Sequence, residues 1–430
     1  MKILFVTQYF YPETEIGGIR IAEIARHLLA QGHEPVILTG FPNYPSGKLH
    51  PDYQRRIWHG SYTELVDGLR VFRVALYPSH SKTTMPRLAN YFSFAITASM
   101  RSLTISDFDV VVATSPPLTV GIPALLKSTA SQIPLVLEVR DLWPESAVQL
   151  GYLQNQTVRS TAYGLERLLY ARASRIVCVS NGIRDDIVAR GIPAAKCAVL
   201  TNGIDTDLFR PEARDENVEE LKRSGSIVGV YLGSLSAYHG LEHALDLLEQ
   251  LRPSAHVKVI FSGGGSAESE FRTALDARRL KNAVFLPALS RKHMPGVIAS
   301  SAFCLAFVKE SSFSRWLLSS KIFMYMACGR PIYAAANGET RRVIEEAGAG
   351  YVVQPNAYGI SQLAKRIGEL RGDAIASSYG FNGRTYALRY CSWERIAKEY
   401  EQVLTAALDP RARVAASHDL PESATGTLNL

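Results

Sequence analysis

The chain has 430 residues, of which 47% are hydrophobic and 20% charged, which excludes a globally disordered chain and allows two or three globular domains. Lysine and arginine outnumber aspartate and glutamate by 47 to 40, and this modest net charge of +7 suits an anionic substrate or an anionic membrane surface without requiring either. The five cysteines never occur as Cys-x-x-Cys, which argues against a disulfide scaffold or a zinc site and favours reduced thiols in a cytosolic protein.

The N-terminus does not have the composition of an export signal. Its apolar run, Ile3–Val6, is short and continues into Tyr9–Glu13 without a small-residue cleavage site. No stretch of the chain approaches the roughly 18 apolar residues that a spanning helix needs. We therefore expect a cytoplasmic protein without a transmembrane helix.

Short apolar runs alternate with helical patterns through the first half of the chain. Nearly continuous runs of this kind are typical of strands that a parallel sheet buries on both faces. Between the first two runs, Ile19–Ala30 has apolar residues at helical spacing and ends before Gly32, which indicates a strand–helix–strand unit. The expected strands are Ile3–Thr7, Val36–Thr39, Leu69–Val74, Val110–Thr114, Leu135–Val139, Ile176–Ser180 and Ala198–Thr201.

The second half repeats this alternation. Two sets of parallel strands with interleaved helices predict an α/β protein of two Rossmann-like, doubly wound domains that face each other across a cleft. We place the N-terminal domain at 1–205, a polar linker at 206–226, the C-terminal domain at 227–390, a terminal helix at 391–408 and a disordered tail at 409–430. The expected strands are Val228–Leu232, Val257–Phe261, Val284–Leu286, Cys304–Phe307, Ile332–Ala335 and Tyr351–Val353.

Two adjacent glycines, Gly17 and Gly18, stand between the first strand and the first helix. Glycine lets the backbone approach a ligand closely, and a helix N-terminus attracts phosphate. A tight turn without a ligand is an equally good interpretation. The pattern is not G-x-G-x-x-G, which disfavours an NAD-dependent oxidoreductase.

Apolar residues recur at helical spacing between Pro86 and Leu103, with Arg87 and Arg101 near the two ends. A helix of this kind most often packs on the core of its domain. The alternative is an interfacial helix that also contacts a lipid acceptor, and on that alternative Arg87 and Tyr91 are candidate acceptor-binding residues.

Arg140 and Asp141 directly follow a buried strand. Adjacent charges at such a position are costly unless they are paired or functional. A structural Arg–Asp pair is one interpretation. We favour a functional one, because ligands of α/β sheets bind at the carboxyl ends of strands.

Two further candidate loops follow strands of the second half, at Gly233-Ser234 and at Gly263–Gly265. Ser320 is a candidate N-cap for a helix whose first turn contains Lys321. A lysine there opposes the helix dipole, which favours an anionic partner such as a diphosphate, although a solvated lysine is the competing interpretation.

Eight motifs, spread in order from Tyr9 to Phe323, carry a resemblance to a known family that runs from residue 1 to about residue 408. With these motifs the chain resembles glycosyltransferase family 4, and within it a branch of bacterial surface-polysaccharide enzymes that includes L-fucosamine and colanic-acid transferases. The motifs are Tyr9–Glu13 with Gly17-Gly18, Gly32–Glu34, Pro42–Pro45, Arg140–Glu145, Asn202–Asp205, Gly233–Leu235, His239–Leu241 and Ser320–Phe323.

The resemblance implies a GT-B fold, a retaining mechanism, no required metal and no cofactor. It implies an acceptor-binding N-terminal domain and a donor diphosphate held mainly by the C-terminal domain, with the loop at Gly17-Gly18 approaching the donor. Many members place a catalytic or sugar-orienting histidine at the strand end that holds Arg140-Asp141 here. The resemblance therefore points to Asp141, with Arg140 beside it, for the catalytic role.

Other positions depart from the family pattern. The arginine and lysine that bind the diphosphate in the family correspond to Ser234 and His239 here. The two glutamates of the family's E-x7-E motif correspond to Trp316 and Met324. The positive charge that binds the phosphates is then expected from Lys321, Arg315 or Lys309. The carboxylate that binds the sugar or the ribose is expected from Glu310 or Glu339. The expected donor-binding residues are Gly17, Gly18, Gly233, Ser234, His239, Gly263, Glu310, Arg315, Lys321 and Glu339.

The expected function is transfer of a sugar, an N-acetylated hexosamine, from a nucleoside diphosphate, UDP, to a lipid-linked or saccharide acceptor in surface polysaccharide assembly. Contact with an anionic membrane would be peripheral, at the inner face of the plasma membrane and through the surface near Pro86–Arg101, and no nucleic-acid partner is expected. Two alternatives remain. One is a catalytically silent subunit that partners an active transferase, which the missing glutamates favour, and the other is an enzyme similar to the epimerases that hydrolyse UDP-GlcNAc.

Overall fold

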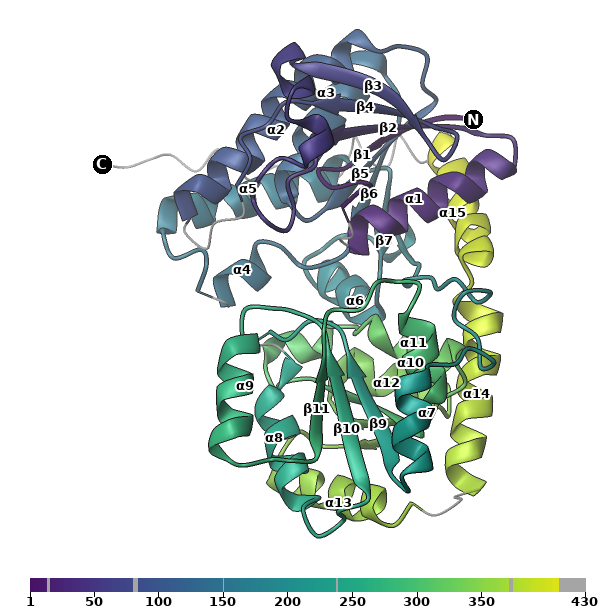
Figure 1. Ribbon diagram of the computed structural model, residues 1–430. Coiled ribbons are helices and arrows are strands. Elements are labelled where there is room, and N and C mark those ends of the chain that lie inside the picture. Colours follow the sequence, from purple (N-terminus) through teal and green to yellow (C-terminus); the bar gives the residue numbers. More distant parts are fainter. Residues whose placement is uncertain (14–15, 80–83, 150, 237–238, 371–373, 410–430) are drawn as a thin grey trace. The chain divides into compact units, whose positions relative to one another are not determined.

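The computed structural model describes residues 1–13, 16–79, 84–149, 151–236, 239–370 and 374–409. The chain divides into two compact units (Figure 1). The first unit comprises Met1–Thr201 and the segment that starts at Trp393, and the second comprises Asn202–Ser392. Each is built on a parallel sheet, which confirms the predicted α/β class with two doubly wound domains. The predicted tail, 409–430, lies outside the described residues except for Asp409.

The sheet of the first unit has eight strands in the order β3-β4-β2-β1-β5-β6-β7-β8. All seven predicted strands are present and parallel, whereas β3 was not predicted and pairs antiparallel with β4. Residues of β3 alternate between exposed and half-buried, so this edge strand lacks the continuous apolar run of the others. The strands are β1 (Lys2–Val6), β2 (Glu34–Gly40), β3 (Ser61–Val66), β4 (Leu69–Val74), β5 (Val110–Ser115), β6 (Leu135–Val139), β7 (Arg175–Cys178) and β8 (Cys197–Val199).

Helices cover both faces of this sheet. Helix α1 packs along α15, and α2 packs along α3, and Figure 1 shows the two pairs on opposite sides of the strands. Although α15 follows the second unit in the sequence, its Trp393 and Tyr400 lie in the same core as Phe5 of β1. The helices are α1 (Ile16–Ala30), α2 (Thr84–Thr104), α3 (Gly121–Ser131), α4 (Glu145–Gln149), α5 (Gln156–Arg172), α6 (Asn181–Ala189) and α15 (Trp393–Leu408).

The sheet of the second unit has six parallel strands in the order β11-β10-β9-β12-β13-β14. Successive residues of β9 point to opposite faces, because Val230 packs in one core cluster and Tyr231 in the other. The strands are β9 (Ile227–Leu232), β10 (Val257–Ser262), β11 (Ala283–Leu286), β12 (Phe303–Phe307), β13 (Ile332–Ala335) and β14 (Gly350–Val353).

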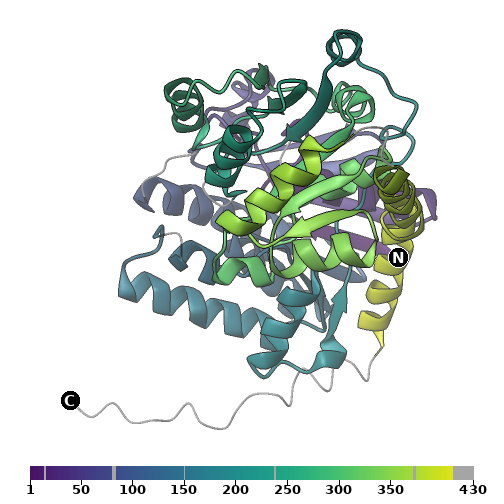
Figure 2. The same cartoon turned by 90° about the horizontal axis from the view of Figure 1, so that it is seen from below.

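Helices of the second unit lie on both faces of its sheet (Figures 1 and 2). One face is covered by α8, α9 and α13, and the other by α7, α10, α11, α12 and α14. The helices are α7 (Glu216–Arg223), α8 (Leu241–Gln250), α9 (Glu268–Ala277), α10 (Met294–Ser300), α11 (Lys321–Ala327), α12 (Gly338–Glu346), α13 (Ala357–Gly368) and α14 (Ala374–Tyr390).

The segment expected as a linker, 206–226, is an integral part of the second unit. Phe209 is 1% exposed and Val218 is fully buried, and both belong to the core cluster under β9. The charged residues that suggested a linker instead form the solvent face and the cap of α7, where the Asp215 carboxylate accepts a hydrogen bond from the Val218 amide at 3.1 Å. Within the described part of the chain, no helix is long and apolar enough to cross a bilayer.

Candidate functional site

Two glycine-bearing loops meet at the carboxyl edge of the second sheet. Gly233 follows β9 with a φ of +119°, and its amide donates a hydrogen bond to the carbonyl of Ser262 at 3.0 Å. Gly263 follows β10 with a φ of +143°, and a Cβ there would clash with the carbonyl oxygen of Gly233. Only glycine fits where the loops touch, at the edge where α/β sheets bind their ligands.

The side chain of Lys321, the first residue of α11, reaches these loops. Its Nζ lies 3.8 Å from the centroid of the Tyr231 ring and 3.7 Å from the position that a Cβ on Gly233 would take. Lys321 is only 5% exposed, and its Nζ has no hydrogen-bond partner among the described residues. A buried ammonium without an anion is costly, so the arrangement suits binding of an anionic ligand.

Burial lowers the pKa of Lys321 to about 7, because desolvation penalises the charged form. The Tyr231 ring presents its face to the ammonium but supplies no negative charge, since its hydroxyl donates to the carbonyl of Ser234 at 3.0 Å. An anion within hydrogen-bonding distance of Nζ would raise this pKa and hold the lysine in its charged form.

His239 is a neutral group in this environment. Burial, together with the nearby charge of Lys321, lowers the pKa of His239 to about 2. Its Nδ1 lies 2.8 Å from the hydroxyl of Ser236. His239 therefore supplies hydrogen bonds near Lys321, and it does not replace the cation that the family pattern places at this position.

Helix α11 is fixed to the end of β9 by a residue that the sequence analysis missed. The hydroxyl of Tyr325 accepts a hydrogen bond from the Leu232 amide at 2.9 Å. Lys321 and Tyr325 are four residues apart and so share one face of the helix, which is the signal that could have identified Tyr325. Ser320, expected as the N-cap, makes no capping hydrogen bond with its side chain.

The other expected donor-binding residues of the second unit make different contacts. Glu339 is 5% exposed and its carboxylate accepts two hydrogen bonds from Arg342, each at 3.0 Å. Glu310 is exposed and accepts from the Asn337 side-chain amide at 3.5 Å. Arg315 is also exposed, with its guanidinium 4.6 Å from the centroid of the Trp316 ring. The structure thus brings Gly233, Ser234, Gly263, Lys321 and His239 together, while Glu310, Arg315 and Glu339 contact Asn337, Trp316 and Arg342 respectively.

Trp316 and Met324, which replace the family's two glutamates, pack as apolar residues. Trp316 is 2% exposed, and Met324 is half-buried against the core cluster that contains Val230. A carboxylate at either position would be desolvated, so the apolar side chains fit the surroundings they have.

In the first unit, Gly17 makes room for Arg140. A Cβ at Gly17, in the first turn of α1, would clash with the guanidinium of Arg140. That guanidinium is held by donating from Nε to the Thr114 hydroxyl at 3.1 Å and from NH2 to the Pro116 carbonyl at 2.9 Å. Gly18 packs closely on the backbone of Tyr9. Glycine at position 17 is therefore required by a side chain of the protein itself.

A buried ion pair holds the Thr114 side chain that accepts a hydrogen bond from Arg140. Glu138 accepts a hydrogen bond from the Thr114 hydroxyl at 2.8 Å and another from Arg20 Nε at 2.9 Å. The side chains of Arg20 and Glu138 are fully buried. Sequence analysis missed this pair, because Glu138 was read as part of an apolar strand. An acid inside such a run was the available signal.

Asp141 lies partly exposed just after β6. Burial of its carboxyl group raises its pKa, although hydrogen bonds from the Ser146 hydroxyl and the Leu142 amide, and the charge of Arg140, act in the opposite direction. A carboxyl group at the carboxyl edge of the sheet is suitably placed to interact with a ligand's hydroxyls or with developing positive charge.

Glu13, the last residue of the Tyr9–Glu13 motif, is a second acid at this sheet edge, and no role was predicted for it. Its carboxylate accepts hydrogen bonds from the backbone amides of Phe10, Asn43 and Tyr44 at 3.1, 2.7 and 2.7 Å. Burial nevertheless raises the pKa of Glu13 to about 7. Glu13 thus connects the loop after β1 to the loop after β2.

The two expected acceptor-binding residues, Arg87 and Tyr91, lie in the first half of α2. The guanidinium of Arg87 is 4.7 Å from the centroid of the Tyr152 ring. Burial raises the pKa of Tyr91, although Arg87 and a hydrogen bond with Tyr9 lower it. Arg101, near the other end of α2, lies 4.5 Å from the Phe72 ring.

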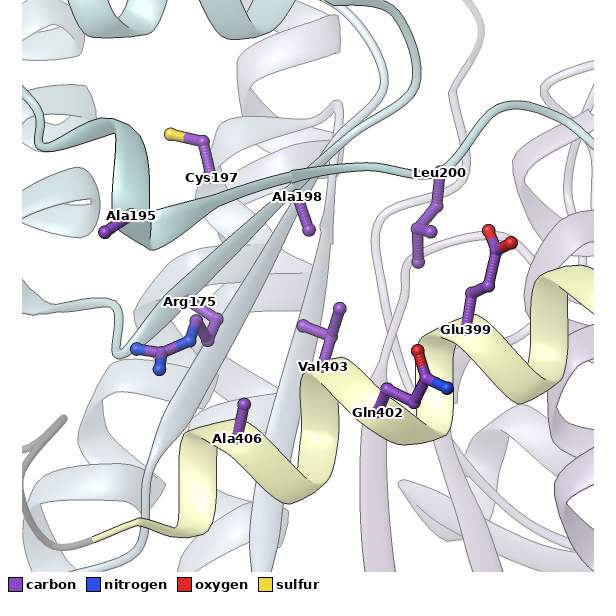
Figure 3. Close-up of a pocket in the computed structure, with 9 residues that line it drawn as sticks. All are labelled: Arg175, Ala195, Cys197, Ala198, Leu200, Glu399, Gln402, Val403 and Ala406. Atoms are coloured by element: carbon purple, nitrogen blue, oxygen red, sulfur yellow. The ribbon is translucent and has the colours of Figure 1, made fainter.

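A pocket of about 360 Å³ lies in the first unit between β8 and α15 (Figure 3). None of the predicted site residues lines it. The lining residues are Arg175, Ala195, Cys197, Ala198, Leu200, Glu399, Gln402, Val403 and Ala406.

Two known domain families match the chain. Residues 17–203 match the glycosyl transferase 4-like domain, and residues 226–373 match the glycosyl transferases group 1 domain. In sequence, the chain is 23% identical over 414 residues to an Escherichia coli protein named as the colanic acid biosynthesis glycosyl transferase WcaI, covering 93% of this chain and 98% of that protein.

Solved structures share the fold. Sucrose-phosphate synthase from Thermosynechococcus elongatus superposes with a TM-score of 0.72 at 15% identity, covering 94% of this chain and 98% of the other. HepE from Anabaena, solved in complex with UDP and glucose, superposes with a TM-score of 0.68 at 18% identity, covering 94% and 100%.

Proposed function

Because the chain belongs to glycosyltransferase family 4, we propose that it is a retaining, metal-independent enzyme that moves a sugar from a nucleoside diphosphate to an acceptor. The proposed nucleotide is UDP, the sugar an N-acetylated hexosamine, and the acceptor a polyprenyl-linked or saccharide molecule of surface polysaccharide assembly. The name of WcaI supports the pathway, and the UDP and glucose bound to HepE support the donor class.

The observation that carries the proposal is the buried Lys321 ammonium beside the Gly233 loop. A diphosphate would supply the missing anion, and the paired glycine loops allow its oxygens to approach the backbone. A charge-assisted hydrogen bond of this kind contributes about 1.5–3 kcal/mol.

For the chemical step we propose Asp141 as the catalytic residue. Transfer from a nucleoside diphosphate builds positive charge at the sugar carbon, and a carboxylate facing that carbon stabilises it. Arg140, fixed by Thr114 and by the Pro116 carbonyl, lies beside Asp141 and the N-terminus of α1. We propose Arg87 and Tyr91 for the acceptor, and action at the inner face of the plasma membrane.

One observation favours a second candidate, a catalytically silent subunit. Trp316 and Met324 put apolar side chains where the family has glutamates. Such a chain would retain its fold while its partner performed the transfer.

The test is to titrate the purified chain with UDP, GDP and ADP by calorimetry and then to incubate it with a panel of nucleotide sugars. Tightest binding of UDP with release of UDP from a donor supports the transferase. UDP binding without release, even with lipid-linked and saccharide acceptors, supports the silent subunit. Absence of binding to all three nucleotides would contradict both.

A further inference from the structure

The segment that leads into α11 has little regular structure of its own. Residues 317–319 belong to no helix or strand, and Ser320 makes no capping hydrogen bond with its side chain. The first turn of α11 starts with Lys321 and contains no acidic residue, so the helix dipole disfavours the charge placed there. The position of the Lys321 ammonium therefore depends on contacts that fix this segment from outside.

Thr340 makes such contacts. It is the third residue of α12, which covers the same face of the second sheet as α11 (Figure 1). Its hydroxyl accepts a hydrogen bond from the Ser319 amide at 3.1 Å and donates one to the carbonyl of Leu317 at 2.8 Å. Thr340 is fully buried and Ser319 is 6% exposed, so these hydrogen bonds lie away from water.

The hydroxyl of Thr340 serves another part of the chain. In a helix, a threonine hydroxyl commonly bonds to the backbone of its own helix. At Thr340 it bonds instead to backbone groups 21 and 23 residues earlier, and it acts there as both acceptor and donor. Because a buried backbone group without a partner is costly, the hydroxyl determines where Leu317 and Ser319 lie.

The start of α12 also contacts the chain just before this segment. Gly338 has a φ of +60°, and a Cβ there would clash with the carbonyl oxygen of Ser314. Glycine at this position lets the backbone of α12 touch the 3-10 helix η6 (Ser312–Arg315). The first turn of α12 therefore holds the chain on both sides of Trp316, at Ser314 and at Ser319.

We propose that Thr340 is a positioning residue for the donor diphosphate, and that it acts by keeping the Lys321 ammonium beside the Gly233 loop. Its hydroxyl fixes Ser319, two residues before Lys321, and the Tyr325 hydroxyl fixes the same helix one turn later. A cation that is already held in place binds its ligand more tightly, because less ordering is needed on binding. The proposal rests on the proposed function, since it takes Lys321 as the group that binds the diphosphate.

The experiment is calorimetric titration of UDP into the wild type, Thr340→Val, Thr340→Ser, Lys321→Met and the double variant of Lys321→Met with Thr340→Val. Valine keeps the shape of threonine but leaves the Ser319 amide without its acceptor, so we expect UDP to bind Thr340→Val about tenfold more weakly at pH 7. Serine keeps the hydroxyl and should restore the affinity to within about threefold of the wild type. In the Lys321→Met background, Thr340→Val should change the affinity by less than about twofold, because Thr340 acts through Lys321.

The pH profile of UDP binding separates positioning from a purely structural role. His239 and Tyr231 lie beside Lys321, and both stay neutral above pH 7, because burial lowers the pKa of His239 to about 2 and raises that of Tyr231. Lys321, whose pKa burial lowers to about 7, is then the group whose proton uptake weakens UDP binding as the pH rises. In Thr340→Val, water reaches the ammonium and its pKa rises towards the ordinary value, so the fall of affinity with pH should become smaller.

The matched control is Thr273→Val in α9, where an exposed threonine hydroxyl donates to the Ser269 carbonyl of its own helix. It should bind UDP as the wild type does. Should Thr340→Val not fold, hydrogen exchange of the Ser319 amide in the wild type provides the test, and UDP should slow that exchange at least about tenfold.

Three results would overturn the proposal while leaving the proposed function in place. They are a Thr340→Val variant with lowered Tm but wild-type UDP affinity and pH profile, a full additional loss of affinity in the Lys321→Met background, and exchange of the Ser319 amide that UDP does not change. A wild-type chain that binds no nucleotide would refute the proposed function and this proposal with it.

Discussion

At the scale of single residues, two effects compete at Lys321. Desolvation favours the neutral amine and lowers the pKa to about 7, and the face of Tyr231 offsets only part of that cost. His239 does not compete for a phosphate as a second cation, because its own pKa is lowered to about 2. Ligand charge therefore decides the protonation state of Lys321, which links nucleotide binding to pH.

The first prediction follows from this linkage. Above pH 7 the free protein holds Lys321 mainly neutral, so binding UDP requires uptake of a proton, and affinity should fall by up to about tenfold per pH unit between pH 7.5 and 9.5. Calorimetry in buffers of different ionisation enthalpy measures both the affinity and the proton uptake.

The control for this prediction is Lys321→Met. It should weaken UDP binding by about 1–3 kcal/mol and remove the pH dependence. It should also raise the stability of the unliganded protein at pH 7 by about 1–3 kcal/mol, because no uncompensated ammonium is buried. An unchanged affinity would show that another cation, such as Arg315, holds the diphosphate.

The second prediction concerns Asp141→Asn. The side chain keeps its size but loses its negative charge, so we expect kcat to fall at least about 100-fold while UDP affinity stays within about twofold. Asp185→Asn, at an exposed position of α6, is the matched control and should leave turnover unchanged. Near wild-type turnover by Asp141→Asn would refute the assignment.

At the scale of elements, the N-terminus of α1 and the end of β6 constrain each other. Gly17 leaves space for the guanidinium of Arg140, and Thr114 connects Arg140 to the buried pair of Glu138 and Arg20. The N-terminus of α1 and the charged end of β6 are therefore coupled through Arg140. Losing either partner of a buried ion pair costs about 3–5 kcal/mol. The pair of Arg20 and Glu138 therefore keeps Thr114, and through it Arg140, in place.

The third prediction is that Gly17→Ala lowers activity without lowering stability. The new Cβ displaces the guanidinium of Arg140, which is the mobile end of a side chain, while alanine favours the helix over glycine by up to about 1 kcal/mol. We expect reduced kcat with an unchanged or higher Tm. Gly164→Ala in α5, where a Cβ meets nothing within 4 Å, is the control and should raise Tm without affecting kcat. A drop in Tm for Gly17→Ala alone would argue that the glycine serves packing only.

Much of the fold could be predicted at this scale because buried parallel strands leave continuous apolar runs, as in Val110–Ser115 and Leu135–Val139. The edge strand Ser61–Val66 has no such run, since it is half-exposed, and it was missed. At the site, glycines after strands led to Gly233 and Gly263. The acid inside the apolar run Leu135–Val139 was a local signal for Glu138, but nothing near it in the sequence indicated its partner, Arg20, which is 118 residues away.

At the scale of the whole molecule, the chain leaves the first unit after Thr201 and returns to it at Trp393. The returning helix α15 packs along α1, and its Tyr400 ring lies 6.2 Å from the ring of Phe5. The amphipathic pattern of α15 predicted a helix but could not indicate its partner, because either unit offers an apolar surface. The stability of the first unit is therefore tied to the last helix of the chain.

The last prediction is that truncation after Ser392 unfolds the first unit. It removes Trp393, Ile396, Tyr400 and Leu404, each at most 6% exposed, and uncovers the apolar side chains of α1 and β1. At about 1.5–3 kcal/mol for each fully buried side chain, the loss is on the order of 6–12 kcal/mol, which is comparable to the whole stability of a typical domain. Thermal unfolding followed by circular dichroism should show loss of the cooperative transition of the first unit, or insoluble expression. Truncation after Asp409 keeps α15 and should unfold as the full chain does. If the shorter truncation product unfolded at the same temperature as the longer one, α15 would be dispensable and the first unit would end at Thr201, where the chain leaves it.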